Sequence, residues 1–165
     1  MPEPHTAAEP FILFELAGTT YGVPSRLVQQ MEKVEHITPV PNAPPFVEGL
    51  VFLRGQVVPA ISLRARFGFP RVPHDVRTRL VVLHTDARTV GLVVDTAREF
   101  VRIPLSAIQP APEAVPGTSD RYLEGIAELN GRLILILSVE AVLATPEDLG
   151  VPDEASAGVP AGGSG

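Results

Sequence analysis

The fold is decided by a stretch that occurs twice without gaps, as Gly49-Leu-Val-Phe-Leu-Arg-Gly-Gln-Val-Val-Pro-Ala-Ile-Ser-Leu-Arg-Ala-Arg-Phe67 and as Gly125-Ile-Ala-Glu-Leu-Asn-Gly-Arg-Leu-Ile-Leu-Ile-Leu-Ser-Val-Glu-Ala-Val-Leu143. Each copy begins at a glycine, runs through an apolar strand, turns at a second glycine and enters another apolar strand. Each then passes a serine, Ser62 or Ser138, into a short stretch with helical spacing. Two copies of one β unit predict a body with two similar faces, which favours binding over catalysis.

The segments before these two stretches also match. Phe11-Ile-Leu-Phe14 ahead of Gly22 corresponds to Leu80-Val-Val-Leu83 ahead of Gly91. The offset between the copies is 69 positions at this glycine and 76 at the glycine that opens the quoted stretch. The second copy therefore carries extra residues, which we expect in its middle connector.

Short strands separated by turn residues are the dominant pattern of the chain. We expect them near residues 11–17, 20–24, 28–35, 49–54, 56–62, 79–85, 89–95, 97–103, 124–129 and 132–138. Two sets of five predict an all-β fold of two small barrels side by side, and closure removes exposed strand edges. The predicted barrels span residues 11–78 and 79–143, although an early or late strand could complete the opposite barrel, and flexible tails are expected at 1–10 and 144–165.

The two hairpin tips differ in a way that draws attention to Arg54. Asn130-Gly131 suits a type I′ turn, in which both central residues need a positive φ. Arg54-Gly55 occupies the same place in the first copy but is a weaker turn pair. A long cation at such a tip indicates a contact with a partner, and the alternative is a solvated turn arginine.

Several strands are apolar on both faces, whereas a strand of an isolated small barrel should alternate. They are Leu133–Leu137, Gly91–Val94 and Val57–Ile61. Their outer faces must be covered by the other barrel, by a short helix or by another protein.

Composition excludes several functional classes. Of the 165 residues 45% are hydrophobic and 19% charged, so a real core is expected. The chain has no cysteine, which rules out disulfides and thiolate zinc sites and is compatible with a reducing cytoplasm. Its net charge of −6 argues against nucleic acid or an anionic membrane as the main partner. No signal peptide and no apolar run of about 18 residues is present, so we expect no membrane insertion.

Residues with catalytic or cofactor-binding spacing are not evident. The histidines, His5, His36, His74 and His84, are far apart, so no metal ligand set is predicted. The sequence contains no phosphate-binding glycine loop and no nucleophile elbow, so no enzyme activity and no cofactor are expected.

A basic stretch, Arg64–Arg79, holds five arginines opposed only by Asp75. We interpret it as a solvated bridge between the two halves. The alternative is a surface for an anionic partner, which would make the protein a tandem β-barrel nucleic-acid binder. Such surfaces interleave aromatic with basic residues, and here only Phe67 and Phe69 are available.

A longer series of motifs runs from about Phe11 to Leu143. In order they are Phe11-Ile-Leu-Phe14, Tyr21-Gly22, Val28-x-x-Met31, Ile37-Thr-Pro-Val-Pro41, Phe46-Val-Glu-Gly49, Leu53-Arg-Gly55, Val58-Pro59, Ser62-Leu-Arg64, Phe67-Gly68, Val90-Gly-Leu-Val-Val-Asp95, Tyr122-Leu-x-Gly125 and Gly131-Arg-Leu-Ile134. Together they resemble the CheW family, the adaptors of bacterial chemosensory arrays. The resemblance implies two five-stranded SH3-like barrels and a scaffold without enzyme activity.

The resemblance also implies partners and site residues. The expected partners are the regulatory domain of a CheA-type histidine kinase and the cytoplasmic tip of chemoreceptors. Ile12 and Val28 match apolar positions that contact the kinase in the family, and Arg54 matches an arginine associated with receptor coupling. An array modulator that binds kinase but not receptor is the alternative within this neighbourhood.

Three residues depart from the family pattern. Phe52 replaces the asparagine before Leu-Arg-Gly, Gln30 replaces a usual glutamate, and Ser62 replaces a common aspartate. Because the two acids are missing, we expect Arg54 to be largely exposed and without a strong salt bridge in its own chain.

Overall fold

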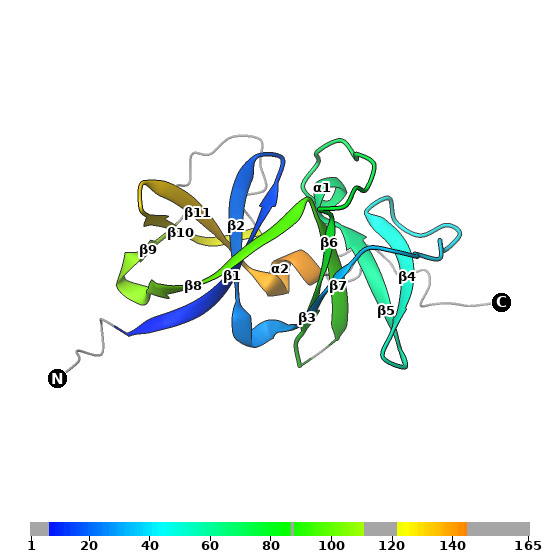
Figure 1. Cartoon of the computed structure of the whole chain (residues 1–165), viewed down its shortest axis with the longest axis horizontal. Helices are drawn as coiled ribbons and strands as arrows, with labels where there is room; N and C mark the ends of the chain where they lie inside the picture. Colours follow the sequence, from blue (N-terminus) through cyan, green and yellow to red (C-terminus); the bar gives the residue numbers. More distant parts are fainter. Residues whose placement is uncertain (1–6, 87, 111–121, 145–165) are drawn as a thin grey trace.

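The structure is a computed structural model that describes residues 7–86, 88–110 and 122–144 (Figure 1). Its strands are β1 (Ala8–Leu16), β2 (Thr19–Pro24), β3 (Val28–Lys33), β4 (Val47–Leu53), β5 (Gln56–Ser62), β6 (Arg79–His84), β7 (Thr89–Val94), β8 (Thr96–Pro104), β9 (Ile108–Gln109), β10 (Leu123–Leu129) and β11 (Arg132–Leu137). The helices are the 3-10 turns η2 (Ser25–Leu27) and η3 (Leu105–Ala107) and the short α1 (Leu63–Arg66) and α2 (Val139–Leu143). The all-β fold with short helices is confirmed.

The structure describes only a small part of the two predicted tails. The predicted N-terminal tail is too long by three residues, because β1 begins at Ala8 and pairs with β8. Of the predicted C-terminal tail only Ala144 lies within the described residues, and the connector of the second copy falls largely in 111–121, outside them.

The two sheets divide the chain differently from the predicted halves. The six-stranded sheet has the order β8-β1-β2-β11-β10-β9, and the five-stranded sheet has the order β3-β6-β7-β5-β4. One barrel is thus built from strands within residues 8–24, 96–109 and 123–137, and the other from strands within the continuous stretch 28–94. The expected boundary between residues 78 and 79 is therefore wrong. Both copies present the same apolar pattern, so similarity alone does not reveal that their first two strands are exchanged.

The exchange is reciprocal and follows the repeat. β2 pairs in parallel with β11, with Gly22 beside Ile136, and β7 pairs in parallel with β5, with Gly91 beside Ala60. These pairs are equivalent under the offsets of 69 and 76 residues found in the sequence. Each barrel consequently combines two strands from one copy with the remaining strands of the other copy, as Figure 1 shows.

Matching local structure supports the equivalence of the two copies. The predicted hairpin tips both have positive φ, at 49° and 79° for Arg54 and Gly55 and at 56° and 78° for Asn130 and Gly131. The two serines each cap the next helix, because Ser62 Oγ accepts from Ala65 N at 3.2 Å and Ser138 Oγ accepts from Ala141 N at 3.3 Å. The hairpin tips therefore occupy equivalent places, as predicted.

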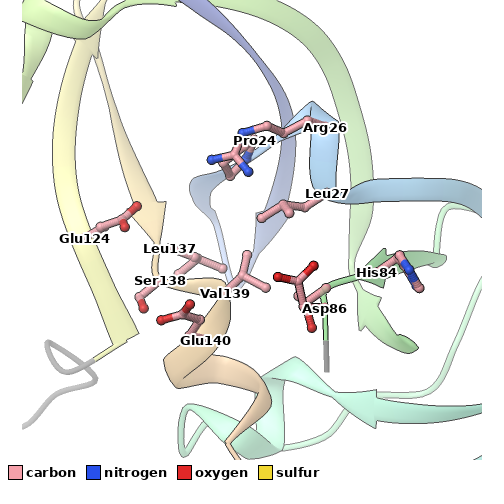
Figure 2. Close-up of a pocket in the computed structure, with 11 residues that line it drawn as sticks. Pro24, Arg26, Leu27, His84, Asp86, Glu124, Leu137, Ser138, Val139 and Glu140 are labelled. Atoms are coloured by element: carbon pink, nitrogen blue, oxygen red, sulfur yellow. The ribbon is translucent and has the colours of Figure 1, made fainter. Parts of the chain in front are cut away.

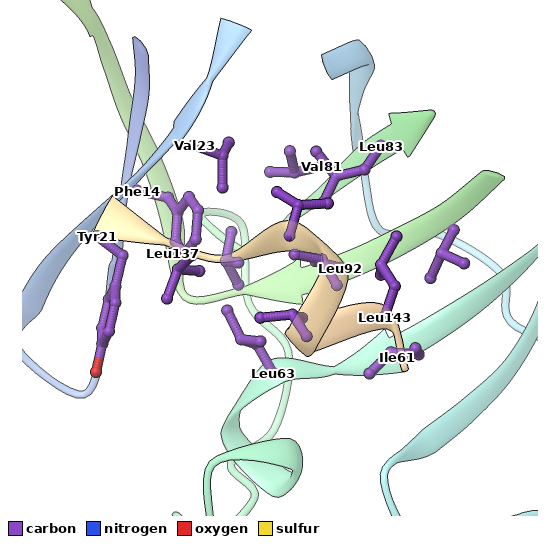
Figure 3. Close-up of a cluster of buried hydrophobic side chains, with 14 of the residues drawn as sticks. Phe14, Tyr21, Val23, Ile61, Leu63, Val81, Leu83, Leu92, Leu137 and Leu143 are labelled. Atoms are coloured by element: carbon purple, nitrogen blue, oxygen red, sulfur yellow. The ribbon is translucent and has the colours of Figure 1, made fainter. Parts of the chain in front are cut away.

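Buried side chains form three clusters, one inside each barrel and one between the barrels. The interior clusters are centred on Leu13 and Ile134 in one barrel and on Leu80 and Val58 in the other. The third, which we call the inter-barrel core, contains Ile12, Phe14, Leu16, Tyr21, Val23, Ile61, Leu63, Val81, Leu83, Val90, Leu92, Val94, Tyr122, Leu137, Val139, Val142 and Leu143. Figure 3 shows these side chains meeting around α2. The two-faced apolar strands are thus covered mainly by the other barrel and by a helix.

The C-terminal end of α2 is held by arginines from elsewhere in the chain. Arg66, only 9% exposed, donates to the carbonyl oxygens of Val142 at 3.1 Å and Ala144 at 2.5 Å. Arg88 donates to the Leu143 carbonyl at 3.0 Å. These bonds satisfy carbonyls that the helix end leaves open. The interpretation of Arg64–Arg79 as a solvated bridge is therefore wrong for Arg66, which is a buried structural residue.

The backbone of the connector after β3 lies very close to β4 of the five-stranded sheet. Thr38 and Leu50 exchange two backbone hydrogen bonds of 2.8 Å, which joins the connector after β3 to β4. A Cβ on Gly49 would lie 2.2 Å from the Thr38 carbonyl oxygen, so only glycine permits this contact. The bridge fixes the connector that follows β3 against the middle of β4.

Candidate docking surface

Arg54 is displayed at the tip of the β4–β5 hairpin. Its side chain is 76% exposed, and its Nη2 lies 3.7 Å from Glu32 Oε2 at the end of β3. The predicted exposure and the lack of a strong ion pair are confirmed, since so long and exposed a contact contributes little stability. Sequence reasoning missed Glu32. It lies two residues after Gln30 on the same strand face and provides the loose carboxylate partner that Gln30 does not.

Two apolar side chains flank Arg54 on the same hairpin. Phe52 in β4 is 71% exposed, and its cross-strand partner Val57 in β5 is 57% exposed. A shallow groove of about 290 Å³ adjoins them and is lined by Phe52, Leu53 and residues 32–37. We call Glu32, Phe52, Arg54 and Val57 the hairpin-tip surface. An apolar pair beside a cation with a loose partner is well suited to bind another protein.

Val28 opens β3, which forms one edge of the five-stranded sheet. It lies opposite Leu83 in the sheet register, is half-buried and packs against the inter-barrel core. Met31, further along β3, is 44% exposed. The edge strand therefore offers an apolar surface of which Val28 is a part.

Ile12 lies in a different environment. It belongs to the inter-barrel core and is only 8% exposed. Its register partner across the β1–β8 pair, Phe100, is 60% exposed. The structure thus places Ile12, which was expected at the kinase contact, in the core with little exposed surface. Phe100 is an exposed aromatic that sequence reasoning missed, although an apolar residue between Glu99 and Arg102 in a predicted strand was a usable signal.

Comparison with known proteins identifies the family. A sequence profile of the CheW-like domain matches residues 10–147. The chain belongs to the CheW family. It is 32% identical over 142 residues to the chemotaxis protein CheW of Klebsiella aerogenes, covering 86% of each chain. It is 33% identical over 148 residues to CheW of Bacillus subtilis, covering 89% of this chain and 95% of that one.

A solved structure shows the same fold. The crystal structure of the scaffolding protein TtCheW from Thermoanaerobacter tengcongensis superposes with a TM-score of 0.77 at 28% identity, covering 88% of this chain and 94% of that one. The resemblance seen in the sequence is thereby confirmed, and the chain is a CheW-type scaffold of a chemosensory system. This family is one of adaptors and not a known class of enzymes.

Two structural observations bear on the remaining expectations. Within residues 7–86, 88–110 and 122–144, no helix is long and apolar enough to cross a membrane. Over the same ranges, no three histidine or acidic side chains gather closely enough to hold a metal ion.

Proposed function

We propose that this CheW-family chain couples the cytoplasmic tip of chemoreceptors to a CheA-type histidine kinase. In this proposal it works in the cytoplasm and is associated with the membrane only through receptor arrays. The surface that includes Val28 contacts the regulatory domain of the kinase, with Ile12 supporting it from the core. Arg54 contacts the receptor.

One observation carries the proposal. Arg54 adopts a φ of 49° at a turn where its counterpart is Asn130, and its side chain is 76% exposed. A left-handed conformation is less favourable for arginine than for asparagine, whose short polar side chain can hydrogen-bond locally. Its only ion pair among the described residues is the 3.7 Å contact with Glu32. The contacts among the described residues therefore do not explain an arginine at this tip. A partner that accepts hydrogen bonds from its planar guanidinium would explain it.

The test measures kinase autophosphorylation in membranes that contain receptor, with the kinase and this chain added. We expect Arg54→Ala to abolish receptor-dependent control while leaving kinase binding within about twofold, a change of under 0.5 kcal/mol. Arg54→Lys should restore control only in part, because an ammonium group does not reproduce the two-pronged geometry of guanidinium.

Gln56→Ala serves as the matched control, since Gln56 is an exposed polar residue of the same hairpin. It should leave control unchanged. Wild-type kinase control by the Arg54→Ala protein would contradict the assignment of Arg54. Failure of the wild-type chain to co-sediment with a receptor fragment, with and without kinase, would instead support a modulator that binds kinase alone.

The kinase contact is tested separately at Val28. Val28→Arg places a charge in a desolvated apolar contact, so binding to the regulatory domain should fall at least about tenfold, or ~1.4 kcal/mol. Far-ultraviolet circular dichroism and the melting temperature check that the fold is intact. Because Val28 is half-buried, an unfolded variant would show that its role is structural and would overturn its assignment to the kinase surface.

A further inference from the structure

The two copies of the repeat each form a groove at the start of their short helix, and among the described residues only the first groove is covered by the chain. The first contains Glu48, Ser62, Arg64 and Asp95. The second contains Glu124, Ser138, Glu140 and Arg26, which are their counterparts under the two sequence offsets. We call the first the closed groove and the second the open groove. They have about 20 and 560 Å³ of free space respectively.

The closed groove is covered by the chain itself. Residues from the stretch 68–78 line it, and Arg71 Nη1 lies 3.2 Å from Glu48 Oε2. His74 Nε2 lies 3.5 Å from the same oxygen. Arg71 also donates to the Pro45 carbonyl. An extended stretch with prolines and apolar residues therefore covers the groove, and its arginine neutralises the glutamate.

The second ion pair of the closed groove is missing from the open one. Arg64 forms two hydrogen bonds to Asp95, of 2.8 and 2.7 Å, across the closed groove. In the open groove the two charges are reversed, as Glu140 and Arg26, but Arg26 instead pairs with Glu9 at 3.0 Å. The open groove is thus not bridged by its own side chains at this position.

Three carboxylates, those of Asp86, Glu124 and Glu140, line the open groove around a partly apolar floor that includes Leu27, Leu137 and Val139 (Figure 2). Among the residues that the structure describes, none of the three carboxylates forms an ion pair within 4.0 Å. Because Arg26 pairs with Glu9, these carboxylates leave the groove net acidic, and among the described residues Glu124 has no arginine partner such as its counterpart Glu48 has.

We propose that the open groove binds an extended segment of a partner protein that carries an arginine or lysine flanked by proline and apolar residues. The closed groove provides the template, since it shows such a segment bound in the equivalent place. Charge complementarity favours a basic side chain opposite the three carboxylates. The lining of the open groove includes neither Arg54 nor Val28, and the proposal does not rest on the roles assigned to those residues.

The C-terminal stretch of this chain has the wrong charge for the same place. The residues that correspond to Arg71 and His74 under the offset of 76 are Glu147 and Gly150. The stretch 145–154 contains four acidic residues and no basic one. Placing it over the open groove would bring carboxylates against carboxylates, which is unfavourable.

The test uses the full chain and a synthetic peptide with the sequence of residues 68–78, Gly-Phe-Pro-Arg-Val-Pro-His-Asp-Val-Arg-Thr. Amide chemical shifts locate the binding site, and calorimetry gives its affinity. We expect saturable binding, with the shifted amides at Glu124, Ser138, Val139 and Glu140. The same peptide with Arg71→Glu should bind at least about tenfold more weakly, because removing one partner of a charge pair commonly costs that much or more.

Substitutions in the protein complete the test. Glu124→Gln should weaken binding of the arginine peptide about tenfold, whereas Glu35→Gln, which removes an exposed carboxylate elsewhere, should leave it unchanged. Absence of saturable binding, or equal binding of both peptides, overturns the proposal. Removal of residues 145–165 should change the affinity by less than about twofold. A tenfold gain on truncation would make the chain's own tail the occupant and would also overturn the proposal.

Discussion

At the scale of single residues, Asp95 shows how one ion pair ties distant parts of the chain together. The Arg64 guanidinium donates two hydrogen bonds to its carboxylate, and the Ala17 backbone N–H donates a third at 2.9 Å. These bonds hold the pKa of Asp95 below its ordinary value of 3.8, against the opposing effect of partial burial. Asp95 thereby connects α1, the end of β7 and the β1–β2 turn.

This lowered pKa predicts a loss of stability in acid. A carboxyl group with a depressed pKa in the folded state stabilises the fold fully above its unfolded value, and the contribution is lost as the pH falls through the folded pKa. We expect Asp95→Asn to have a lower urea midpoint than the wild type at neutral pH. At about pH 2.5 the two midpoints should lie closer together. Asp86→Asn, at an exposed position, is the control. If the urea midpoints of Asp95→Asn and the wild type differed by the same amount at both pH values, the prediction would be contradicted.

Single residues also mark where sequence reasoning stopped. Arg66 and Val142 are equivalent positions of the repeat. They are also in contact, since Arg66 Nε donates a hydrogen bond to the Val142 carbonyl oxygen. Nothing in the local pattern distinguishes this buried arginine from the exposed Arg77 nearby. Its role depends on the position of α2, which lies 76 residues away along the chain. Exposure of Arg54, by contrast, followed from its place at a hairpin tip.

At the scale of elements, the turn of the β4–β5 hairpin combines a local strain with a surface role. Replacing Arg54 by asparagine, which its counterpart already is, should stabilise the protein by about 0.5 kcal/mol, because asparagine tolerates the left-handed conformation better. Asn130→Arg should have the opposite effect and serves as the reciprocal control. Denaturant midpoints with unchanged slopes measure both changes. A destabilised Arg54→Asn protein would show that the contact with Glu32 outweighs the strain.

Most strands could be predicted because they alternate with clear turn residues. The expected 89–95 and 132–138 correspond closely to β7 (Thr89–Val94) and β11 (Arg132–Leu137). The two-residue strand β9 was not predicted, since so short a strand has no periodicity of its own. β9 exists only because Ile108 and Gln109 pair with Ala127 and Ile126 of β10. The sequence pattern of one strand does not show with which distant segment that strand pairs.

At the scale of the whole molecule, the exchange of strands decides which fragments can fold. A cut between residues 78 and 79 separates β3, β4 and β5 from β6 and β7 of the same sheet. We therefore expect fragments 1–78 and 79–165 each to lack a dispersed amide spectrum and to regain one when they are mixed. Fragment 25–95 contains every strand of the five-stranded sheet and should be folded when isolated.

Fragment 25–95 would also expose its share of the inter-barrel core, which includes Ile61, Leu83 and Leu92. We expect it to self-associate, and sedimentation velocity would measure this. Independent folding of 1–78 would contradict the exchange. The division into halves could not be predicted, because the two copies are similar enough for either pairing of their strands to satisfy the same apolar pattern.

The order of strands also matters while the chain is being made. The barrel of residues 28–94 is continuous, so it can close as soon as β7 has left the ribosome. β1 and β2 emerge first, yet their neighbour β8 follows only after the continuous barrel, and their neighbour β11 is the last strand, followed by α2. Phe11 and Leu13 can pair early with β2, but their core partners Ala127, Ile134 and Ile136 are made only when almost the whole described chain has been synthesised. For a growing polypeptide this is the interval in which a chaperone that recognises exposed apolar strands would find its substrate.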